Sequence, residues 1–589
     1  MSYVFVPQPN RTKARSCSDI QKTCKAVVLD GCSSSSTAEL GALGTWGKWS
    51  NNVERDLHRH CNKNNLTGSL KPYYCSTTIK DSNGQHQPAE IPILLPHEMV
   101  DAVYNASKLD FETRFFGEGG RDACADFWER SREQTWFHRH SARRHILREP
   151  SNAVPVRLHG DDAPTFKSTG IFVLQWCSVL CRLASWLSRF LIMCVPTSNM
   201  IEHVTLEPVF EAVVWSFQIL ATGGAFPRRD HLGREFAAGS HRKEKSDGII
   251  AGGLLFITCQ VIGDWKWLKE EFRLRYHYGT NECCWKCRAK KRQGGRVTAW
   301  NFGLDAPWAS MVRSHEEFMT HLRSVLCKLP GFHVDCLLCD IMHLMMLGCL
   351  QWANGGVLWE LATTYCLWPG AASAWKPRMK IRLEAAYEDF KHWLKAEHME
   401  SSQGIFTIGR LSMSALHNTP MLKAKAGNGM KISYWLCNKV TRLADQKPGD
   451  HYLQVMALMM WGYCEMISLL HRSPLWLDDD TANKLMITRE AALFANAELS
   501  GLAIAASRNI FPLKPKLHMV DHLCREAASN RLNPAFYWTF ADEDFIGRMK
   551  SLAKSCHRST VAKRVSERYV IRLFALIRAR DARWRNSVA

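Results

Sequence analysis

The sequence has few acidic residues for its content of basic ones, and it contains no long uninterrupted apolar segment. It holds 56 Asp and Glu residues against 76 Lys and Arg residues, which gives a formal net charge of +20. Such an excess predicts an anionic partner, and nucleic acid is the most common one. The longest stretch without a formal charge, residues 341–359, is interrupted by His343, Gln351 and Asn354. A membrane span needs roughly 18 or more apolar residues in a row, so we expect a soluble protein without a membrane partner.

A disulfide framework is also missing. The 22 cysteines do not follow the spacing of a disulfide-rich module, and we expect no secretory signal peptide. Several cysteines, among them Cys177, Cys194 and Cys259, lie inside apolar segments typical of strands. Thiols of this kind behave as small buried apolar side chains, which indicates a reducing compartment. The N-terminal region shows no regular zinc finger and no helix-turn-helix, although Cys61 and Cys75 stand near two histidines.

Composition and periodicity divide the 589 residues into five segments. Residues 1–90 contain polar clusters such as the segment from Asp81 to Gly84 and little periodic pattern, so we expect them to be largely disordered. The chain is too long for one ordinary core. The other segments are a helical subdomain at 91–150, the first part of an α/β domain at 151–345, an all-α insertion with 3.6-residue periodicity at 346–508, and a completing part with basic helices at 509–589.

The α/β segment predicts five strands, and the first, fourth and fifth run into an acidic residue, Asp161, Asp264 and Asp340 respectively. The fourth is a continuous apolar run, typical of a strand buried on both faces, and Asp264 follows it. Asp161 ends the first strand. A carboxylate beside a buried strand costs free energy unless it is paired, hydrogen-bonded or bound to a cation. Asp264 could also simply cap the helix predicted after it, because Asp is a favoured N-cap residue. The predicted strands cover residues 154–161, 170–177, 190–195, 252–263 and 333–339, with a helix at 208–221.

A third acidic group, Asp542-Glu543-Asp544, opens a late helix. If the first and fourth strands are neighbours, as in a ribonuclease H-like sheet, this helix could bring a third carboxylate beside Asp161 and Asp264. Carboxylates that close repel one another and require divalent cations. Two Mg²⁺ ions about 3.5–4 Å apart can activate a water molecule and stabilise the leaving oxygen in phosphodiester cleavage.

These motifs and their order resemble the DDE/D transposases of eukaryotic cut-and-paste elements. The resemblance implies a ribonuclease H-like mixed sheet that is interrupted by a large all-α insertion. It also implies that Asp161, Asp264 and Glu543 bind Mg²⁺ or Mn²⁺ and carry out catalysis. Asp542 or Asp544 remains an alternative to Glu543, because the sequence does not fix the phase of the helix. The resemblance covers residues 155–572 and rests on His159-Gly160-Asp161, Gly263-Asp264, Cys284-x-x-Cys287, Asp340-x-x-His343, and Glu543 with Gly547-Arg548.

The same resemblance implies a structural Zn²⁺ between the second and third acids, where several such families carry a C-x2-C pair and a D-x2-H pair. His518 and His522 stand four residues apart on a predicted helix and could also pair on a metal. A position in the core or on the surface is the more common role for two such histidines. The expected zinc ligands are Cys284, Cys287, His343, and Asp340 with Cys339 as its alternative.

DNA is the expected partner, the nucleus is the expected location, and a homodimer or higher oligomer is the expected assembly. Basic residues near the motifs are expected to contact phosphate, with an ordinary solvated basic face as the alternative. These residues are Lys290, Lys291, Arg292, Arg548, Lys554, Arg564, Arg568 and Arg572.

The resemblance thus implies a DNA transposase that hydrolyses one strand at the element end and then transfers the freed 3′-hydroxyl to target DNA. Two alternatives stay open. One is a catalytically inactive, domesticated transposase-derived protein that binds DNA or serves as a scaffold. The other is a ribonuclease H-like nuclease that acts on RNA–DNA hybrids or junctions.

Overall fold

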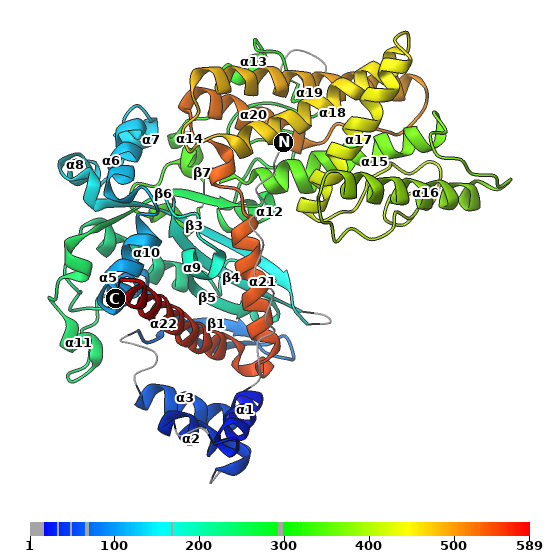
Figure 1. Cartoon of the computed structure of the whole chain (residues 1–589). Coiled ribbons are helices and arrows are strands. Elements are labelled where there is room, and N and C mark those ends of the chain that lie inside the picture. Colours follow the sequence, from blue (N-terminus) through cyan, green and yellow to red (C-terminus); the bar gives the residue numbers. More distant parts are fainter. Residues whose placement is uncertain are drawn as a thin grey trace. The chain divides into compact units, whose positions relative to one another are not determined.

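The computed structural model describes residues 17–31, 34–47, 50–64, 70–166, 169–292, 298–321 and 323–588. They form a mixed α/β structure with a five-stranded mixed sheet and a largely helical C-terminal half (Figure 1). The chain divides into two compact units. The first unit comprises Met1–Val261, Arg323–Cys336 and Ala541–Ala589, and the second comprises Ile262–Leu322 and Leu337–Phe540.

The five-stranded sheet has the strand order β5-β4-β3-β6-β7. β3 (Ala153–Pro164), β4 (Gly170–Ser178) and β5 (Phe190–Pro196) are antiparallel neighbours. β6 (Leu255–Gly263) is the neighbour of β3, and the short β7 (Leu337–Cys339) follows it in the order. Every residue of β6 is buried, as its continuous apolar pattern predicts. The first and fourth strands of this sheet in chain order are therefore adjacent.

Three strands differ from their prediction by three or more residues. β6 begins at Leu255 and not at residue 252, because residues 250–253 form a 3₁₀ turn. β3 continues beyond Asp161, because the antiparallel ladder pairs Asp161 with Val173 and Pro164 with Gly170. Asp161 therefore lies within the strand, and the predicted strand end at this residue is wrong. The fifth strand is shorter than predicted, because residues 334–336 form a 3₁₀ turn before β7.

Aromatic side chains build the core of the first unit on one face of the sheet. Phe115 of α5 (Lys108–Phe115) stacks on Phe190 of β5, with ring centroids 4.9 Å apart. Phe217 of α10 (Glu207–Ala221) meets Trp176 of β4 edge to face at 5.8 Å, and all four rings are buried. The other helices of this unit are α1 (Cys17–Leu29), α2 (Ser35–Gly41), α3 (Val53–Lys63), α4 (Pro96–Ala106), α6 (Gly120–Ser131), α7 (Thr135–His138), α8 (Arg143–Arg148), α9 (Ser185–Ser188), α11 (His241–Lys245), α22 (Val561–Val588) and nearly all of α21 (Phe540–Lys554).

The region that was expected to be disordered contains regular structure where it is described. Besides α1, α2 and α3, the strands β1 (Tyr73–Lys80) and β2 (His86–Ile93) form an antiparallel hairpin. Asp81 and Gly84 belong to its turn: the Asp81 carboxylate accepts hydrogen bonds from two backbone N–H groups at 2.8 Å, and Gly84 has φ of 80°. Residues 1–16, 32–33, 48–49 and 65–69, which share the prediction of disorder, lie outside the described residues.

The second unit is mainly helical, as the 3.6-residue periodicity predicts. α18 (His451–Arg472) packs against α17 (Ala426–Gln446) and α19 (Asp479–Ala505). Among the described residues, α18 is the one helix long and apolar enough to cross a membrane, but 67% of its most apolar window is buried, which fits a core helix. The other helices are α12 (Trp265–Glu271), α13 (Pro307–Ser310), α14 (His315–Met319), the π-helical η7 (Met342–Cys349), α15 (Leu350–Thr363), α16 (Trp375–Ala396) and α20 (Pro515–Asn530).

Candidate metal centre

Two cysteines in a tight loop form one side of a candidate metal centre in the second unit. Cys284 and Cys287 lie between α12 and α13, and both are fully buried. The backbone N–H of Lys286 donates to Cys284 Sγ at 3.3 Å, a contact that favours the thiolate form. On the outer side of the loop, Cys287 forms a bridge with Val312, and Arg313 N donates to Lys286 O at 2.8 Å. The loop is therefore held closed around its two sulfur atoms.

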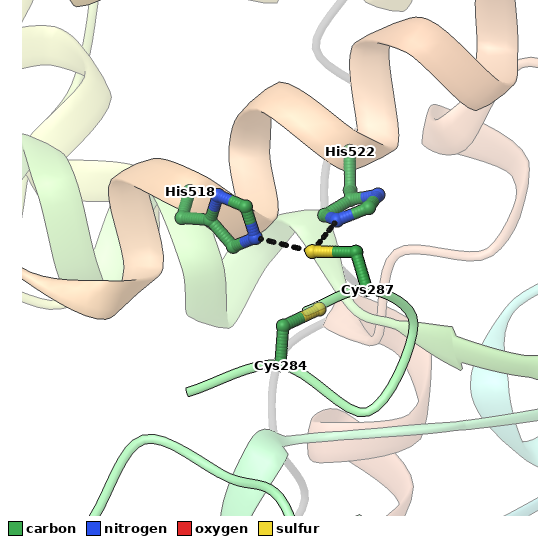
Figure 2. Close-up of side chains that lie close together, drawn as sticks. All are labelled: Cys284, Cys287, His518 and His522. Carbon is green, nitrogen blue, oxygen red and sulfur yellow. Dashed lines mark hydrogen bonds between the residues drawn. The ribbon is translucent and has the colours of Figure 1, made fainter. Parts of the chain in front are cut away.

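Two histidines of α20 form the other side (Figure 2). His518 and His522 are four residues apart, so they lie on one face of the helix. Their Nε2 atoms are 3.3 Å and 3.2 Å from Cys287 Sγ, respectively. One ligand atom from each of Cys284, Cys287, His518 and His522 lies within 4.8 Å of the other three. Figure 2 shows the imidazoles converging with the sulfur atoms between α20 and the loop.

The donor set suits a four-coordinate divalent metal. With metal–sulfur bonds of about 2.3 Å and metal–nitrogen bonds of about 2.0–2.1 Å, the edges of a tetrahedron are about 3.3–3.8 Å. The two distances from Cys287 Sγ are close to this range. Two thiolates would neutralise a divalent cation, and a neutral centre suits four residues that are all buried.

Neighbouring side chains support the two imidazoles. The ring of Trp308 lies against both, with centroid distances of 4.4 Å to His518 and 4.8 Å to His522. Glu526 Oε1 is 3.8 Å from His522 Nδ1, and the Glu526 carboxylate binds Lys286 Nζ at 2.8 Å. Metal-binding histidines commonly have a carboxylate near the second ring nitrogen, and Glu526 is that group for His522.

Burial and mutual contact set the protonation of the four ligands. Burial raises the pKa of the Cys284 thiol, but the contacts with Cys287 and the two imidazoles outweigh it and bring this pKa well below its usual range. Burial and the neighbouring Cys284 raise the pKa of Cys287 far above its usual range. Burial lowers the pKa of His518, whereas the charge on Cys284 outweighs burial and raises the pKa of His522. One thiolate thus forms readily, and a divalent cation would displace the proton from the other sulfur.

Asp340 and His343 belong to a different network. The buried Asp340 carboxylate accepts hydrogen bonds from the backbone N–H of Met342 at 3.0 Å, of His343 at 2.9 Å and of Thr539 at 2.9 Å. It also accepts from the Thr539 hydroxyl and lies close to His343 Nδ1, both at 2.7 Å. A carboxylate offers about four lone-pair positions, so these contacts occupy all the acceptor positions of the Asp340 carboxylate. The expected ligand set is therefore corrected: His518 and His522, not Asp340 and His343, lie with the two cysteines.

Cys339, the alternative fourth ligand, is a buried residue of β7 and is not part of the cluster of four. Burial raises its pKa well above the usual range, which fits a neutral thiol in the core. The H-x3-H spacing of His518 and His522 was the signal in the sequence for the two ligands that the prediction left out.

Two of the three predicted catalytic acids lie together in the first unit. Asp161 comes from β3 and Glu543 from the first turn of α21, and carboxylate oxygens of the two lie within 4.8 Å of each other. Both residues are partly exposed. Two carboxylates at this distance repel each other, and a divalent cation bound by both relieves the repulsion.

The two acids that flank Glu543 are bound to arginines. Asp542 is buried and forms a bidentate pair with the buried Arg189, with N–O distances of 2.8 Å and 2.9 Å. Burial raises the pKa of Asp542, but the adjacent Arg189 outweighs it and holds this pKa well below its usual range. Asp544 pairs with Arg548 at 2.6 Å. Of the three acids that the sequence left open, the structure therefore favours Glu543 as the partner of Asp161.

Asp264, in the second unit, directly follows β6 and caps α12. One of its carboxylate oxygens accepts a hydrogen bond from Trp267 N at 2.6 Å. The capping alternative is therefore correct as a description of this residue. A carboxylate has two oxygens, so capping is compatible with metal binding.

The basic residues expected to contact DNA fall into two groups. Three of them pair with acids: Arg548 with Asp544, Arg564 with Glu567, and Arg568 with Glu54 of α3. On the predicted basic face of α22, Arg564 and Arg568 are therefore ion-paired, and the contact of this face with DNA stays a prediction. Arg292, Lys554 and Arg572 are exposed, whereas Lys290 and Lys291 are half-buried.

Comparison with known proteins gives no relative from which a function could be taken. No protein-family model matches the chain, and no curated protein matches it in sequence.

Proposed function

We propose that this chain is a DDE/D transposase-like protein that hydrolyses and transfers DNA strands with Asp161, Asp264 and Glu543 as ligands of two Mg²⁺ or Mn²⁺ ions. The observation that carries the proposal is the meeting of Asp161 and Glu543, which come from distant parts of the sequence. The strand order β5-β4-β3-β6-β7 supports a ribonuclease H-like fold, in which the first and fourth strands are neighbours.

Divalent ions at such a site lower the pKa of a bound water molecule and stabilise the leaving oxygen of a phosphodiester. The chain supplies the carboxylates and keeps them in place. The buried pair of Arg189 and Asp542 fixes the first turn of α21, and Gln175 Nε2 donates to Asp542 O at 3.4 Å. Glu543, the next residue, is thereby held in a defined position relative to β3. Arg189 and Gln175 act as positioning residues in this proposal.

For Cys284, Cys287, His518 and His522, we infer a structural Zn²⁺ site. Sulfur and imidazole donors favour Zn²⁺ over Mg²⁺, and four protein ligands leave no position for a reacting water molecule. Cys287 and His518 are 231 residues apart. The proposed ion therefore connects the loop before the helical insertion with the helix that follows it.

The test of catalysis uses Asp161→Asn, Glu543→Gln and Asp264→Asn, with Asp162→Asn as the matched control. Asp162 is the exposed neighbour of Asp161, and its side chain points to the opposite face of β3. Asn is as good an N-cap residue as Asp, so Asp264→Asn removes a metal ligand and keeps α12 capped. The assay is nicking of supercoiled plasmid in Mg²⁺ or Mn²⁺.

We expect each of the three variants to lose more than about 100-fold in nicking rate, since partners of metal ligands alone are worth about 10–100-fold. Asp162→Asn should retain the wild-type rate. Nicking at the wild-type rate by all four variants would refute the catalytic proposal. DNA binding without any nicking by the wild-type protein would instead assign the chain to the inactive, DNA-binding alternative.

A further inference from the structure

Acidic residues are absent from three segments of the second unit. Aspartate and glutamate make up 56 of the 589 residues, yet none occurs in residues 341–359, 401–444 or 499–520. All three segments belong to the second unit. A segment of average composition as long as 401–444 would contain several acids, so the local charge balance is strongly positive.

The first two segments meet at the start of α15. Leu422 N donates to Gln351 O at 2.9 Å, and Gln351 Nε2 donates to Ala424 O at 3.1 Å. Lys423 N donates to Arg410 O at 2.8 Å, which brings these two cations side by side on the loop. The Ala424 carbonyl contacts α15, whereas Lys423 and the next lysine, Lys425, are exposed.

The third segment reaches the same part of the molecule from α20. Lys514 Nζ lies 4.8 Å from the ring centroid of Trp352, the residue after Gln351. Lys516 Nζ donates to His343 O at 2.8 Å, at the beginning of η7. These contacts thus place five cations near η7 and the start of α15, which follows η7 directly. We call these five, Arg410, Lys423, Lys425, Lys514 and Lys516, the basic surface.

Within the described residues, no carboxylate forms an ion pair with any cation of the basic surface. Cations elsewhere in the same unit do have such partners. Lys380 pairs with Glu384, Lys391 with Glu388 and Lys484 with Asp480. A group of like charges without acids repels itself, and it also concentrates polyanions near the surface.

We propose that the basic surface binds the phosphate backbone of duplex DNA. The choice of DNA rests on the proposed function. Duplex DNA carries one negative charge for about every 1.7 Å of its length, so several neighbouring cations can each contact a phosphate group along one edge of a groove. Arginine and lysine side chains on a loop and a helix start fix the position of a duplex without reading its sequence. The surface therefore predicts affinity that depends on salt and not on base sequence.

The test compares two triple variants of the full chain. Arg410→Gln, Lys423→Gln and Lys425→Gln remove three exposed cations of the basic surface. Lys380→Gln, Lys391→Gln and Lys484→Gln remove the same charge from the same unit, but from residues that are ion-paired. Fluorescence anisotropy with a short random-sequence duplex, in the absence of Mg²⁺, gives the affinity over a series of salt concentrations. Zinc content and thermal melting check that both variants are folded.

We expect the first triple to bind DNA at least about tenfold more weakly at low salt, with a slope of log affinity against log salt that is shallower by up to about 2.7. The control triple should keep the wild-type affinity and slope. Equal affinities and slopes for the two triples overturn the proposal. So does a loss of binding to phosphatidylserine vesicles with DNA binding unchanged.

The outcome is separable from that of the catalytic proposal, because the binding assay contains no Mg²⁺. Weaker DNA binding by the first triple, together with no nicking by the wild-type protein, leaves the basic surface in place and removes the catalytic assignment. Nicking that depends on Asp161, together with an unchanged affinity and salt slope in the first triple variant, keeps the catalytic assignment and removes the basic surface as a DNA-binding site.

Discussion

Replacement of Cys287 by Ser should release the metal and destabilise the second unit. Cys287 is the ligand in closest contact with the others, since its sulfur is 3.3 Å from His518 Nε2 and 3.2 Å from His522 Nε2. A serine hydroxyl is a poor ligand for Zn²⁺ at neutral pH, where cysteine binds as the thiolate. The variant would leave three ligands in a fully buried site.

The expected loss of stability follows from linkage. A metal that binds only the folded state contributes about 2.7 kcal/mol at a free concentration of 100 times its Kd, and about 4.1 kcal/mol at 1,000 times its Kd. For a unit of about 250 residues, each kcal/mol shifts Tm by about 2–4 °C. We therefore expect Tm of the second unit to fall by roughly 5–15 °C.

Calorimetry of the full chain and metal analysis after purification without chelators provide the two measurements. Cys283→Ser is the matched control, because Cys283 belongs to the same loop directly before Cys284, is as buried as Cys287 and is not in the cluster. The control should keep about one zinc ion per chain and respond to chelators like the wild-type protein. A wild-type protein without zinc, or a Cys287→Ser variant with full zinc and an unchanged Tm, would refute the reasoning.

Two further predictions concern ion pairs in the first unit. Asp542→Asn should lower the free energy of unfolding by about 3–5 kcal/mol in urea denaturation, because it leaves the buried Arg189 without its counter-charge. Since Arg189 lowers the pKa of Asp542, this contribution to stability is present above the unfolded-state pKa of about 3.9 and is lost as the pH falls below that value. A difference in the free energy of unfolding between wild type and variant that stays constant from about pH 7 to about pH 2 would contradict this prediction. Glu54→Gln should weaken the contact of α3 with Arg564 and Arg568 of α22 by about 1 kcal/mol, seen as faster hydrogen exchange in α3. Glu39→Gln, which acts on His60 within the N-terminal helices, should leave the contact with α22 unchanged.

Segments with strong periodicity were predicted well from the sequence. The strand expected at 190–195 is β5 (Phe190–Pro196), and the helix expected at 208–221 is α10 (Glu207–Ala221). In both segments, burial of apolar side chains decides the structure locally. The hairpin of β1 and β2 was missed, because the exposed residues of β2 come at its start and the buried ones at its end, which gives no period-two pattern. Its turn at Asp81 was recognised only as a loop.

The candidate metal centre could be predicted only in part. The C-x2-C pair is a local signal, since a tight turn brings Cys284 and Cys287 together whatever the rest of the chain does. The H-x3-H spacing of His518 and His522 is a much weaker signal. Two residues at positions i and i+4 share a helix face in any helix, and the sequence does not show that α20 packs against the cysteine loop. The D-x2-H motif was expected to complete the site because the transposase resemblance implies it together with the C-x2-C pair, but Asp340 uses its carboxylate on Thr539 and on the start of η7.

α20 carries two of the four metal ligands, His518 and His522, and also Lys516 of the basic surface. The basic surface should therefore depend on the metal centre, whereas the metal centre should not depend on the basic surface. Lys516 precedes His518 by two residues, and Asp521, between the two histidines, forms a buried pair with Arg489 of α19. Any shift or rotation of α20 that removes His518 and His522 from the cysteines also moves Lys516 away from the start of η7. Loss of the metal should therefore disturb the basic surface. The reverse does not hold, because Arg410, Lys423 and Lys425 are exposed on a loop that belongs neither to α20 nor to the cysteine loop. Zinc content is thus a valid control for the loop variants, whereas DNA affinity is not a specific measure of damage at the metal centre.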